Sequence, residues 1–443
     1  MDEAQAIDVA RQALEAARAC GAQSAEASVS IARRLHVEAR EDAVARLEGS
    51  TGKSLLLRVF REGRKATLST SDFSPEGLRE AVARAVAHAD LVAVDEFAGL
   101  PDETAGDGVE LELCDPAVAQ RDNAEKVEEA LRLERLIREA DSRVVNSSGS
   151  HYTDALAATA LANTNGFAAG YTWTRVGRST APVALDAGVK RIAQYGTAAR
   201  HLHDLEGLQS VAATAVRRAV DLFGARKPPT MRVPVIFERD VAASILDDVF
   251  AAVSSANVAV GNSWLSGRVG AGIGSELVTV VDDGRLVGGL GSAPFDGEGV
   301  ATRRTSVFER GVLRTFLYDT YYARKLGAAS TGNSTGGGVG PSNFYLEPGG
   351  LTLEELIAAT PRGVLVVDTI GFATEHASGT YSRGARGFFI ENGELAYPID
   401  EFTVAGQYAE MLAAVDAVAN DLRFDASVVS PSFRVAEMTV SGN

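Results

Sequence analysis

The chain has 443 residues, 46% of them hydrophobic, and a formal net charge of −16 at pH 7. It can therefore bury a large core, and its length favours two or more domains. The negative charge repels phosphate backbones and no basic stripe with interleaved aromatic residues occurs, so we expect no nucleic-acid binding. No run approaches the roughly 18 apolar residues of a membrane helix, and the acidic N-terminus differs from a signal peptide, so we expect a cytoplasmic protein without membrane contact.

The N-terminal half alternates between helical and extended patterns. Apolar residues recur every three or four positions over 4–19, 75–91, 124–140 and 208–222, which predicts four amphipathic helices. A period of two over 24–31, 36–40, 54–60, 65–69 and 144–198 predicts strands, and Asn165-Gly166 suits a hairpin turn. Together these patterns predict helices packed on an antiparallel meander with one solvated face.

A linker follows this half. The segment 224–230 contains two adjacent prolines, which exclude both a helix interior and a central strand. We therefore predict an N-terminal α+β domain over 1–223, a linker over 224–230 and a second domain over 231–443.

The second half reads as mainly β with a few helices. We expect strands at 233–237, 277–281, 305–308 and 312–317, with turns at 282–284 and 309–311. We expect helices at 241–253, capped by Asp240, and at 320–326, 352–360 and 408–419, with a loop at 330–341. The overall prediction is an α+β protein whose C-terminal domain is mainly β.

The stretch 363–405 is predicted to form the β-core of this domain. Asn392-Gly393 lies between two apolar runs, and both central residues of a type I′ turn need positive φ, so a hairpin is expected there. Glycines at 371, 379, 384 and 387 interrupt the strands, which marks bulges or close backbone approach. A groove for an extended peptide and a kinked, tightly packed sheet both fit this pattern.

The sequence offers little evidence for a metal site. Cys20 and Cys114 are far apart and outside any metal-binding or disulfide spacing. Among the histidines only His201 and His203 cluster, in the run His201-Leu202-His203-Asp204, and the neighbourhood offers no obvious third ligand. Neither His-Glu-x-x-His nor His-Glu-x-x-x-His occurs, so we expect no metal in this chain.

Ser334 lies in a Gly-x-Ser-x-Gly pattern, and Asp368 and His376 follow it in the order of a Ser…Asp…His triad. A nucleophile elbow needs a strand before the serine and a helix after it. Here a predicted helix ends near Gly327 and three glycines follow. A flexible loop is the favoured interpretation, and a serine-type hydrolase using Ser334 is the alternative.

Motifs along nearly the whole chain resemble the TldD/PmbA peptidase family, also known as modulators of DNA gyrase. Those of the N-terminal half are GAQSAE at 21–26 and STSDFSP at 69–75. Those of the C-terminal half are SGRVG at 266–270, VDDG at 281–284, APFDGEG at 293–299, ARKLG at 323–327, STG at 330–332, GTYSRG at 379–384, IENGE at 390–394 and NDL at 420–422.

The resemblance implies a cytoplasmic heterodimer that degrades unfolded polypeptides or trims precursor peptides. Its TldD-type subunit carries zinc on a His-Glu-x-x-x-His helix plus a later cysteine. Here Leu246 and Ala251 stand where the two histidines would be, and the second half has no cysteine. Because zinc needs about three protein donors, the resemblance implies a TldE/PmbA-type subunit with no metal and no catalytic residue of its own, beside a zinc-bearing TldD-type partner.

The residues expected to face the substrate cavity are Asp247, Asp248, His376, Tyr381, Arg383 and Gly384. A subunit of this kind would offer a sheet edge to an extended substrate, because strand addition binds backbone amides and is nearly indifferent to side chains. A homodimeric peptide-binding protein without catalysis is a further alternative, and self-association is expected to be possible when the partner is absent.

Overall fold

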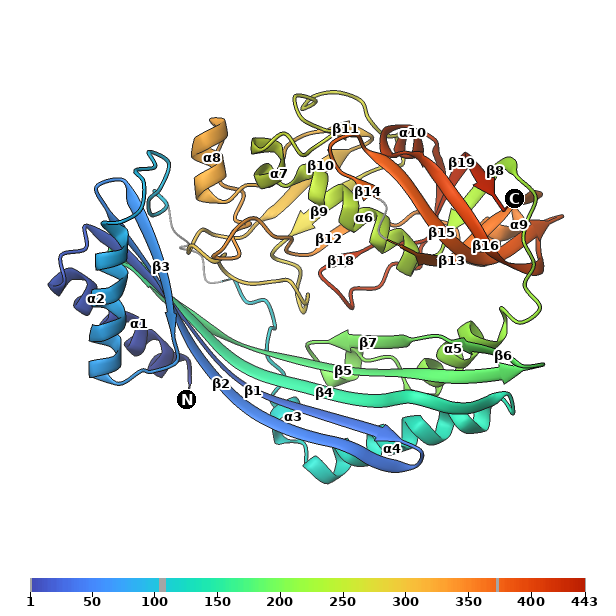
Figure 1. Cartoon of the computed structure of the whole chain (residues 1–443), viewed down its shortest axis with the longest axis horizontal. Coiled ribbons are helices and arrows are strands. Elements are labelled where there is room, and N and C mark those ends of the chain that lie inside the picture. Colours follow the sequence, from blue (N-terminus) through green and yellow to red (C-terminus); the bar gives the residue numbers. More distant parts are fainter. Residues whose placement is uncertain (1, 103–108, 372–373, 443) are drawn as a thin grey trace.

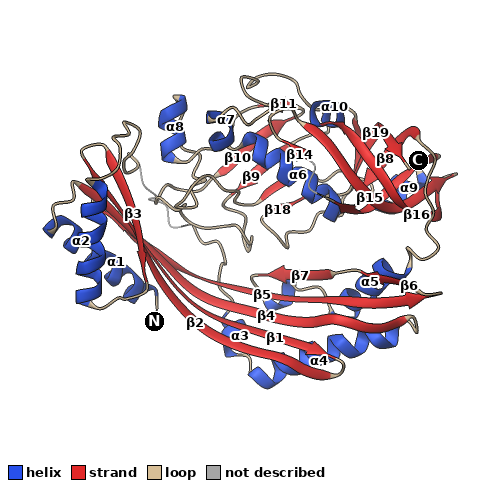
Figure 2. Cartoon of the chain, viewed as in Figure 1, coloured by secondary structure: helices blue, strands red, loops and turns tan. Residues whose placement is uncertain are grey.

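The computed structural model describes residues 2–102, 109–371 and 374–442, and it confirms an α+β fold. Figure 1 shows a long curved sheet built from the N-terminal half and a second, strand-rich body above its concave side. Figure 2 shows that helices gather on the opposite, convex side of the curved sheet. The predicted linker 224–230 runs between the last helix of the first half and the first strand of the second. Within the described ranges, no helix is both long and apolar enough to span a membrane.

The N-terminal sheet is antiparallel, in the order β3-β2-β1-β4-β5-β6, with β7 pairing with β5. Its strands are β1 Ser24–Arg40, β2 Ala43–Arg61, β3 Arg64–Thr70, β4 Val144–Asn163, β5 Ala168–Asp186, β6 Val189–Ile192 and β7 Tyr195–Ala199. The prediction of two short strands at 24–31 and 36–40 is wrong, because β1 is continuous. Two adjacent arginines, Arg33 and Arg34, break the alternation, but they pair with β2 on one side and β4 on the other, and these neighbours satisfy their backbone groups.

The helices of this half are α1 Glu3–Ala19, α2 Pro75–Ala89, α3 Pro116–Gln120, α4 Asn123–Ala140 and α5 Leu208–Val220. Asp2 and Ser74 cap α1 and α2 by accepting hydrogen bonds from first-turn N–H groups. Apolar faces of α1 and α2 pack on Val29 and Leu57 of the sheet. The predicted amphipathic helices are thus confirmed, with ends shifted by one or two residues.

The C-terminal half contains a closed five-stranded barrel. Its sheet runs in the order β13-β8-β19-β16-β15-β14, and β13 also pairs with β15, which closes it. The strands are β8 Met231–Phe237, β13 Arg362–Ile370, β14 Thr374–Glu375, β15 Thr380–Glu391, β16 Glu394–Gln407 and β19 Phe433–Ser441, and β17 Val415–Val418 pairs with β19. A second sheet joins β9 Val280–Asp283, β10 Arg304–Glu309, β11 Val312–Leu313, β12 Phe344–Leu346 and β18 Val428–Val429.

Helices cover these two sheets: α6 Arg239–Val253, α7 Ser255–Ala259, α8 Thr320–Leu326, α9 Leu353–Ala358 and α10 Tyr408–Ala413. Helices α6, α7, α8 and α10 share one large apolar core with the sheets, whereas α9 packs in a separate cluster with Ile236 and Leu365. The predicted hairpin of the β-core is confirmed: Asn392 has φ 53° and Gly393 has φ 78°, as a type I′ turn requires. Positions 372 and 373 of the predicted β-core lie outside the described residues.

Three predictions in this half are wrong in detail. The helix expected over 408–419 ends at Ala413, because the following valines pair with β19 and tertiary pairing outweighs the helix propensity of an alanine-rich segment. Glu238, not Asp240, caps α6 by accepting from the Asp240 N–H. The turn expected at 282–284 begins later, since Asp282 and Asp283 belong to β9 and pair with β10 and β12.

Candidate functional site

Helix α6 presents a polar face toward the barrel. Asp247 and Asp248 follow Ser244 by three and four residues, so both lie next to it on one helical face. The other face carries Val241 and Leu246, which are buried in the core. The apolar half of α6 therefore anchors the helix in the core, and its polar half faces side chains from β15 and α10.

Asp248 is the centre of a compact ionic cluster. The Arg383 Nη2 atom lies 2.6 Å from Asp248 Oδ2, and the Tyr408 hydroxyl donates to the same oxygen at 2.5 Å. The Arg383 Nη1 atom also donates to Ser244 Oγ at 3.2 Å. Because the Arg383 and Asp248 side chains are only 12% and 11% exposed, this charge-assisted pair is shielded from water. The Asp248 carboxylate is therefore already neutralised by a resident cation.

Aromatic side chains form the wall behind this cluster. The Tyr381 and Tyr408 rings meet edge to face at 5.7 Å, and Trp264 stacks on Tyr408 at 6.1 Å. Tyr381 is fully buried, and burial raises the pKa of its phenol, which therefore stays neutral. Gly379 lies against Trp264 with φ +73°, and a Cβ there would approach the indole to 2.8 Å. The neighbour at Gly379 is a side chain and not a backbone segment, so this glycine does not mark the close backbone approach that the sequence predicted.

Asp247 and His376 lie beside the cluster. Burial raises the pKa of Asp247, the Asp248 carboxylate adds to this, and Arg383 and His376 oppose it. The His376 carbonyl accepts a hydrogen bond from the Trp264 N–H at 3.0 Å. The structure thus groups five of the six expected cavity residues around α6, whereas the sixth, Gly384, pairs with neighbouring barrel strands.

Sequence reasoning missed Ser244, Trp264 and Tyr408. Two signals could have found two of them: Trp264 lies two residues before the SGRVG motif, and Ser244 lies three residues before Asp247 on the same helix. Tyr408 carried no local signal, because it begins a helix 160 residues away from its partner Asp248.

The three residues of the alternative triad lie in different surroundings. Ser334 is buried, accepts the Gly336 N–H at 3.1 Å, and lines a 270 Å³ cavity between the two halves of the chain. Asp368 lines another cavity and pairs with Arg386 at 3.0 Å, and His376 lies beside α6. No hydrogen bond joins any two of these three residues in the described structure.

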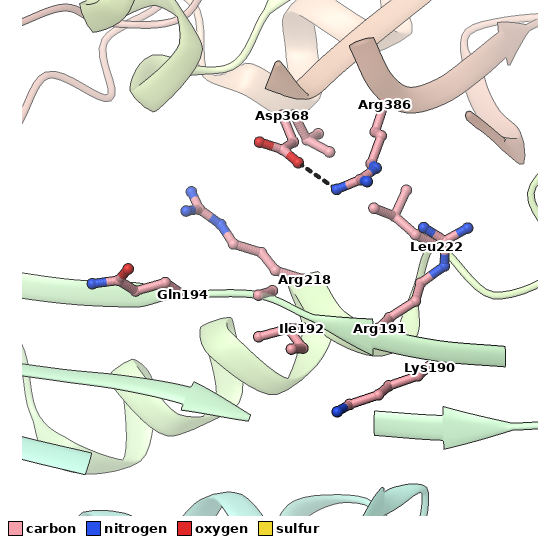
Figure 3. Close-up of a pocket in the computed structure, with 10 residues that line it drawn as sticks. Lys190, Arg191, Ile192, Gln194, Arg218, Leu222, Asp368 and Arg386 are labelled. Atoms are coloured by element: carbon pink, nitrogen blue, oxygen red, sulfur yellow. Dashed lines mark hydrogen bonds and ion pairs between the residues drawn. The ribbon is translucent and has the colours of Figure 1, made fainter. Parts of the chain in front are cut away.

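The cavity that contains Asp368 lies between β6 and the barrel and has a volume of 430 Å³ (Figure 3). Basic side chains line it, yet each of its arginines already has a carboxylate partner. Arg386 binds Asp368, Arg191 binds Asp400 at 2.9 Å, and Arg218 binds Glu238 at 3.0 Å. The last two pairs link the N-terminal half to the C-terminal half. This cavity therefore lies at an interface that ion pairs form between the two halves.

A buried ion cluster joins the halves at a second point. Arg58 of β2 contacts Glu26 of β1 and, across the junction, Glu298 at 3.3 Å and the Gly297 carbonyl at 2.5 Å. Burial raises the pKa of Glu26 to about 7, outweighing the opposing effect of Arg58, and burial likewise raises the pKa of the nearby Asp296 to about 7.

Arg200 binds a nearby segment of the C-terminal half, residues 289–290, through backbone carbonyls and without a carboxylate. Its guanidinium donates to the carbonyls of Gly289 at 3.2 Å, Leu290 at 2.6 Å and Thr174 at 3.1 Å, so it links the segment to β5. Burial lowers its pKa to about 10, which still leaves it charged at neutral pH. Sequence reasoning missed both arginines, because their partners are far away in the chain.

The residues around α6 do not fit a zinc ion. Zinc sites use three or four histidine, cysteine or carboxylate donors, and the described residues contain no group of three placed to hold a metal. Leu246 is buried in the core, and the Asp248 carboxylate is paired with a guanidinium that would repel a second cation. The chemistry that this cluster supports is charge pairing and hydrogen bonding.

Comparison with known proteins agrees with this architecture. Models of the PmbA/TldA metallopeptidase domain 1, central domain and C-terminal domain match residues 25–89, 117–223 and 230–442. The metalloprotease PmbA of Escherichia coli O157:H7 is 32% identical over 94% of this chain and 92% of its own length. The chain belongs to the PmbA/TldD family of metallopeptidases. The PmbA homolog of Haemophilus influenzae is 33% identical over 97% of this chain and 95% of its own.

Solved structures of the PmbA/TldD family share the fold. A candidate modulator of DNA gyrase from Bacteroides thetaiotaomicron superposes with a TM-score of 0.92 at 26% identity, covering 98% of both chains. TldE from Thermococcus kodakarensis superposes with a TM-score of 0.90 over 98% of this chain and 100% of its own. At 22% identity, the likeness to TldE shows the fold alone.

Proposed function

We propose that this chain is the TldE/PmbA-type subunit of a cytoplasmic two-subunit zinc metallopeptidase, in which a TldD-type subunit holds the zinc. The substrates would be unfolded polypeptides or precursor peptides. The observation that carries the proposal is the cluster at α6: Arg383 and Tyr408 occupy Asp248, and Leu246 and Ala251 stand where the resemblance places two zinc-binding histidines.

The physical role of such a subunit is to hold peptide and partner in place. An ion pair shielded from water fixes α6 against β15 and α10, so the surface beside it stays rigid. Residues at this surface, such as Asp247 and His376, can contact a bound peptide, whereas the partner supplies the chemistry of hydrolysis. A rigid surface lowers the entropy cost of ordering an extended chain.

The test measures zinc content and proteolysis on the same preparations. The full chain would be purified, dialysed against excess zinc and then buffer, and analysed for metal by mass spectrometry. Cleavage of an unfolded protein would be followed for this chain alone, for a TldD-type subunit alone and for their mixture. We expect substoichiometric zinc and no cleavage from the isolated chain, and chelator-sensitive cleavage from the mixture.

Two outcomes would contradict the proposal. One is a tightly held zinc ion in the isolated chain at one equivalent. The other is cleavage by the isolated chain that survives a chelator. In the second case a fluorophosphonate probe, with Ser334→Ala as control, decides whether the serine-type alternative holds.

A further inference from the structure

A cavity of 350 Å³ lies on strands β1, β2, β4 and β5 of the N-terminal sheet. One row of directly paired residues crosses its floor: Ser50 lies opposite Arg34, Arg34 opposite Ala155, and Ala155 opposite Arg175. Directly paired residues point to the same face of a sheet. The two arginines therefore stand on one face with a single alanine between them.

This face is the concave side of the sheet. Val37 and Val176 are buried with Ala130 of α4, so they point to the convex, helix-covered side. Side chains alternate along a strand, so Arg34 and Arg175 point the other way, and both are exposed. Figure 1 shows that the concave side is turned toward the C-terminal half of the chain. A ligand that reaches this side meets both guanidiniums.

The two guanidiniums have no carboxylate partner. In the parts of the chain that the structure describes, neither the Arg34 nor the Arg175 side chain forms an ion pair or a hydrogen bond. The carboxylate of the neighbouring row, Glu48, pairs instead with Arg46 at 3.7 Å. Like charges on one face of a sheet repel each other, so this arrangement has a stability cost that a bound anion would remove.

A third arginine adds to the positive charge at this place. Arg200 lies close enough to Arg175 for the charge of Arg175 to lower its pKa, in addition to the larger effect of burial. The Arg200 donors are occupied by backbone carbonyls, so Arg200 adds charge without needing an anion itself. A concave surface lined by one sign of charge focuses the electric field and attracts ions of the opposite sign. This cavity therefore attracts anions although the whole chain has a net charge of −16.

The geometry suits a small anion on an extended chain. Residues two strands apart have Cα atoms about 9–10 Å apart, so two long exposed side chains can rotate onto one anion between them. The next row of the floor joins Gly52, Ala32 and Ala157, whose small side chains leave room for a chain that continues along the sheet. Guanidinium groups bind carboxylates through two parallel hydrogen bonds. The negative charge of the whole chain disfavours a polyphosphate, whereas a single carboxylate on a largely neutral chain meets little repulsion.

We propose that Arg34 and Arg175 form a binding site for a carboxylate of the peptide substrate, either its C-terminal carboxylate or an acidic side chain. That the ligand is a peptide rests on the proposed function, whereas the site itself lies in the N-terminal sheet and uses no residue of the α6 cluster. The site gives the chain a preference for peptides that carry a carboxylate over neutral, amidated ones.

Fluorescence anisotropy of the isolated full chain tests this preference without any cleavage. One labelled, unstructured and otherwise uncharged peptide would be compared with a free C-terminal carboxylate and as its amide. A second pair of amidated peptides would carry one internal glutamate or one glutamine, which separates the two sources of the carboxylate. We expect at least one carboxylate peptide to bind about tenfold more tightly than its uncharged counterpart. The difference should shrink at high salt, because exposed charges are screened.

Variants of the two arginines test the residues. Arg34→Gln and Arg175→Gln should each remove most of the preference. Arg33→Gln is the matched control, because Arg33 is the exposed neighbour on β1 that points to the convex side and donates to the Ala119 carbonyl at 3.3 Å. It should leave the preference unchanged. Circular dichroism would confirm that these exposed substitutions leave the fold intact.

A carboxylate built into the chain gives an independent test. Ala155→Asp places an acid between the two arginines, which should abolish the preference, whereas Ala155→Asn should retain it. Because opposite charges on one face attract, Ala155→Asp should also melt at a higher temperature than Ala155→Asn. This second measurement distinguishes a filled site from a damaged sheet.

Several outcomes would overturn the proposal. They are equal affinity for the charged and uncharged peptides, an equal loss in Arg33→Gln and Arg34→Gln, or a preference that survives Ala155→Asp. Inorganic phosphate that displaces the peptide at equal concentration would overturn the assignment to a carboxylate. None of these results affects the zinc and cleavage measurements with a TldD-type subunit, so the proposed function is judged separately.

Discussion

Replacing Arg58 with methionine is the sharpest test of how the two halves are held together. The Arg58 side chain is 7% exposed and lies between Glu26, which is 2% exposed, and Glu298, which is 9% exposed. Removing one partner of a buried ion pair costs about 3–5 kcal/mol, because a buried charge is left uncompensated. We therefore expect Arg58→Met to lower the free energy of unfolding by about that amount at pH 8.

The loss should depend on pH. The pKa values of Glu26 and Asp296 are raised to about 7 in the folded protein, so the folded state binds protons that the unfolded state has released. Their contribution to stability is therefore present below the unfolded pKa and is lost as the pH rises through about 7. At pH 5 both carboxyls are largely protonated, and Arg58→Met should cost only about 1–2 kcal/mol.

Urea unfolding followed by tryptophan fluorescence measures this effect. The chain has two tryptophans, Trp173 in β5 and Trp264 in the loop between α7 and β9, so each half has its own reporter. Arg61→Met is the control, since Arg61 lies on the same strand but its ion pair with Asp90 is 38% and 52% exposed, and it should cost under about 1 kcal/mol. A loss of stability for Arg58→Met that equals the control, or that is the same at pH 5 and pH 8, would contradict this account of the ion cluster.

Three further predictions follow from close contacts in the structure. Gly387→Ala should destabilise the barrel by about 3 kcal/mol or more in urea unfolding, because its Cβ would lie 1.8 Å from the Leu365 carbonyl oxygen, whereas Gly384→Ala has ordinary contacts and should change stability far less. Arg200→Lys should cost about 1–3 kcal/mol, because an ammonium cannot reproduce the fork of donors to four carbonyls, and limited proteolysis should then cut segment 289–292 faster. Asp248→Ala should cost about 3–5 kcal/mol by removing the carboxylate that compensates the buried guanidinium of Arg383, and Asp248→Asn should cost less in the same measurement.

Features with a local cause could be predicted from the sequence. Ser74 followed by proline defined the start of α2, and Asn392-Gly393 defined the hairpin, because caps and turns depend on residues a few positions apart. The glycine at 387 indicated a bulge or close backbone approach, and the structure shows both: the register shifts beside it, and the Leu365 carbonyl touches it. In each case the deciding interaction lies within a few residues or within one strand pair.

Features that depend on distant segments could not be predicted. The resemblance pointed to Asp248 and Arg383 as cavity residues, but nothing local indicated that they pair across 135 residues. The Arg58–Glu298 contact spans 240 residues. The periodicity of apolar residues predicts which face of a helix or strand is buried, but it does not predict which other element covers that face. For the same reason, no local pattern predicted that β13 pairs with β15 and closes the barrel.

The position of β19 has a consequence for synthesis of the chain on the ribosome. This strand is the last in the described sequence, yet it lies between β8 and β16 in the interior of the sheet. The barrel therefore cannot close until some 200 residues after the linker have been translated, which takes roughly 10–40 seconds at typical rates. During that interval β8 and its neighbours lack a pairing strand, so nascent chains should need a chaperone most at this stage.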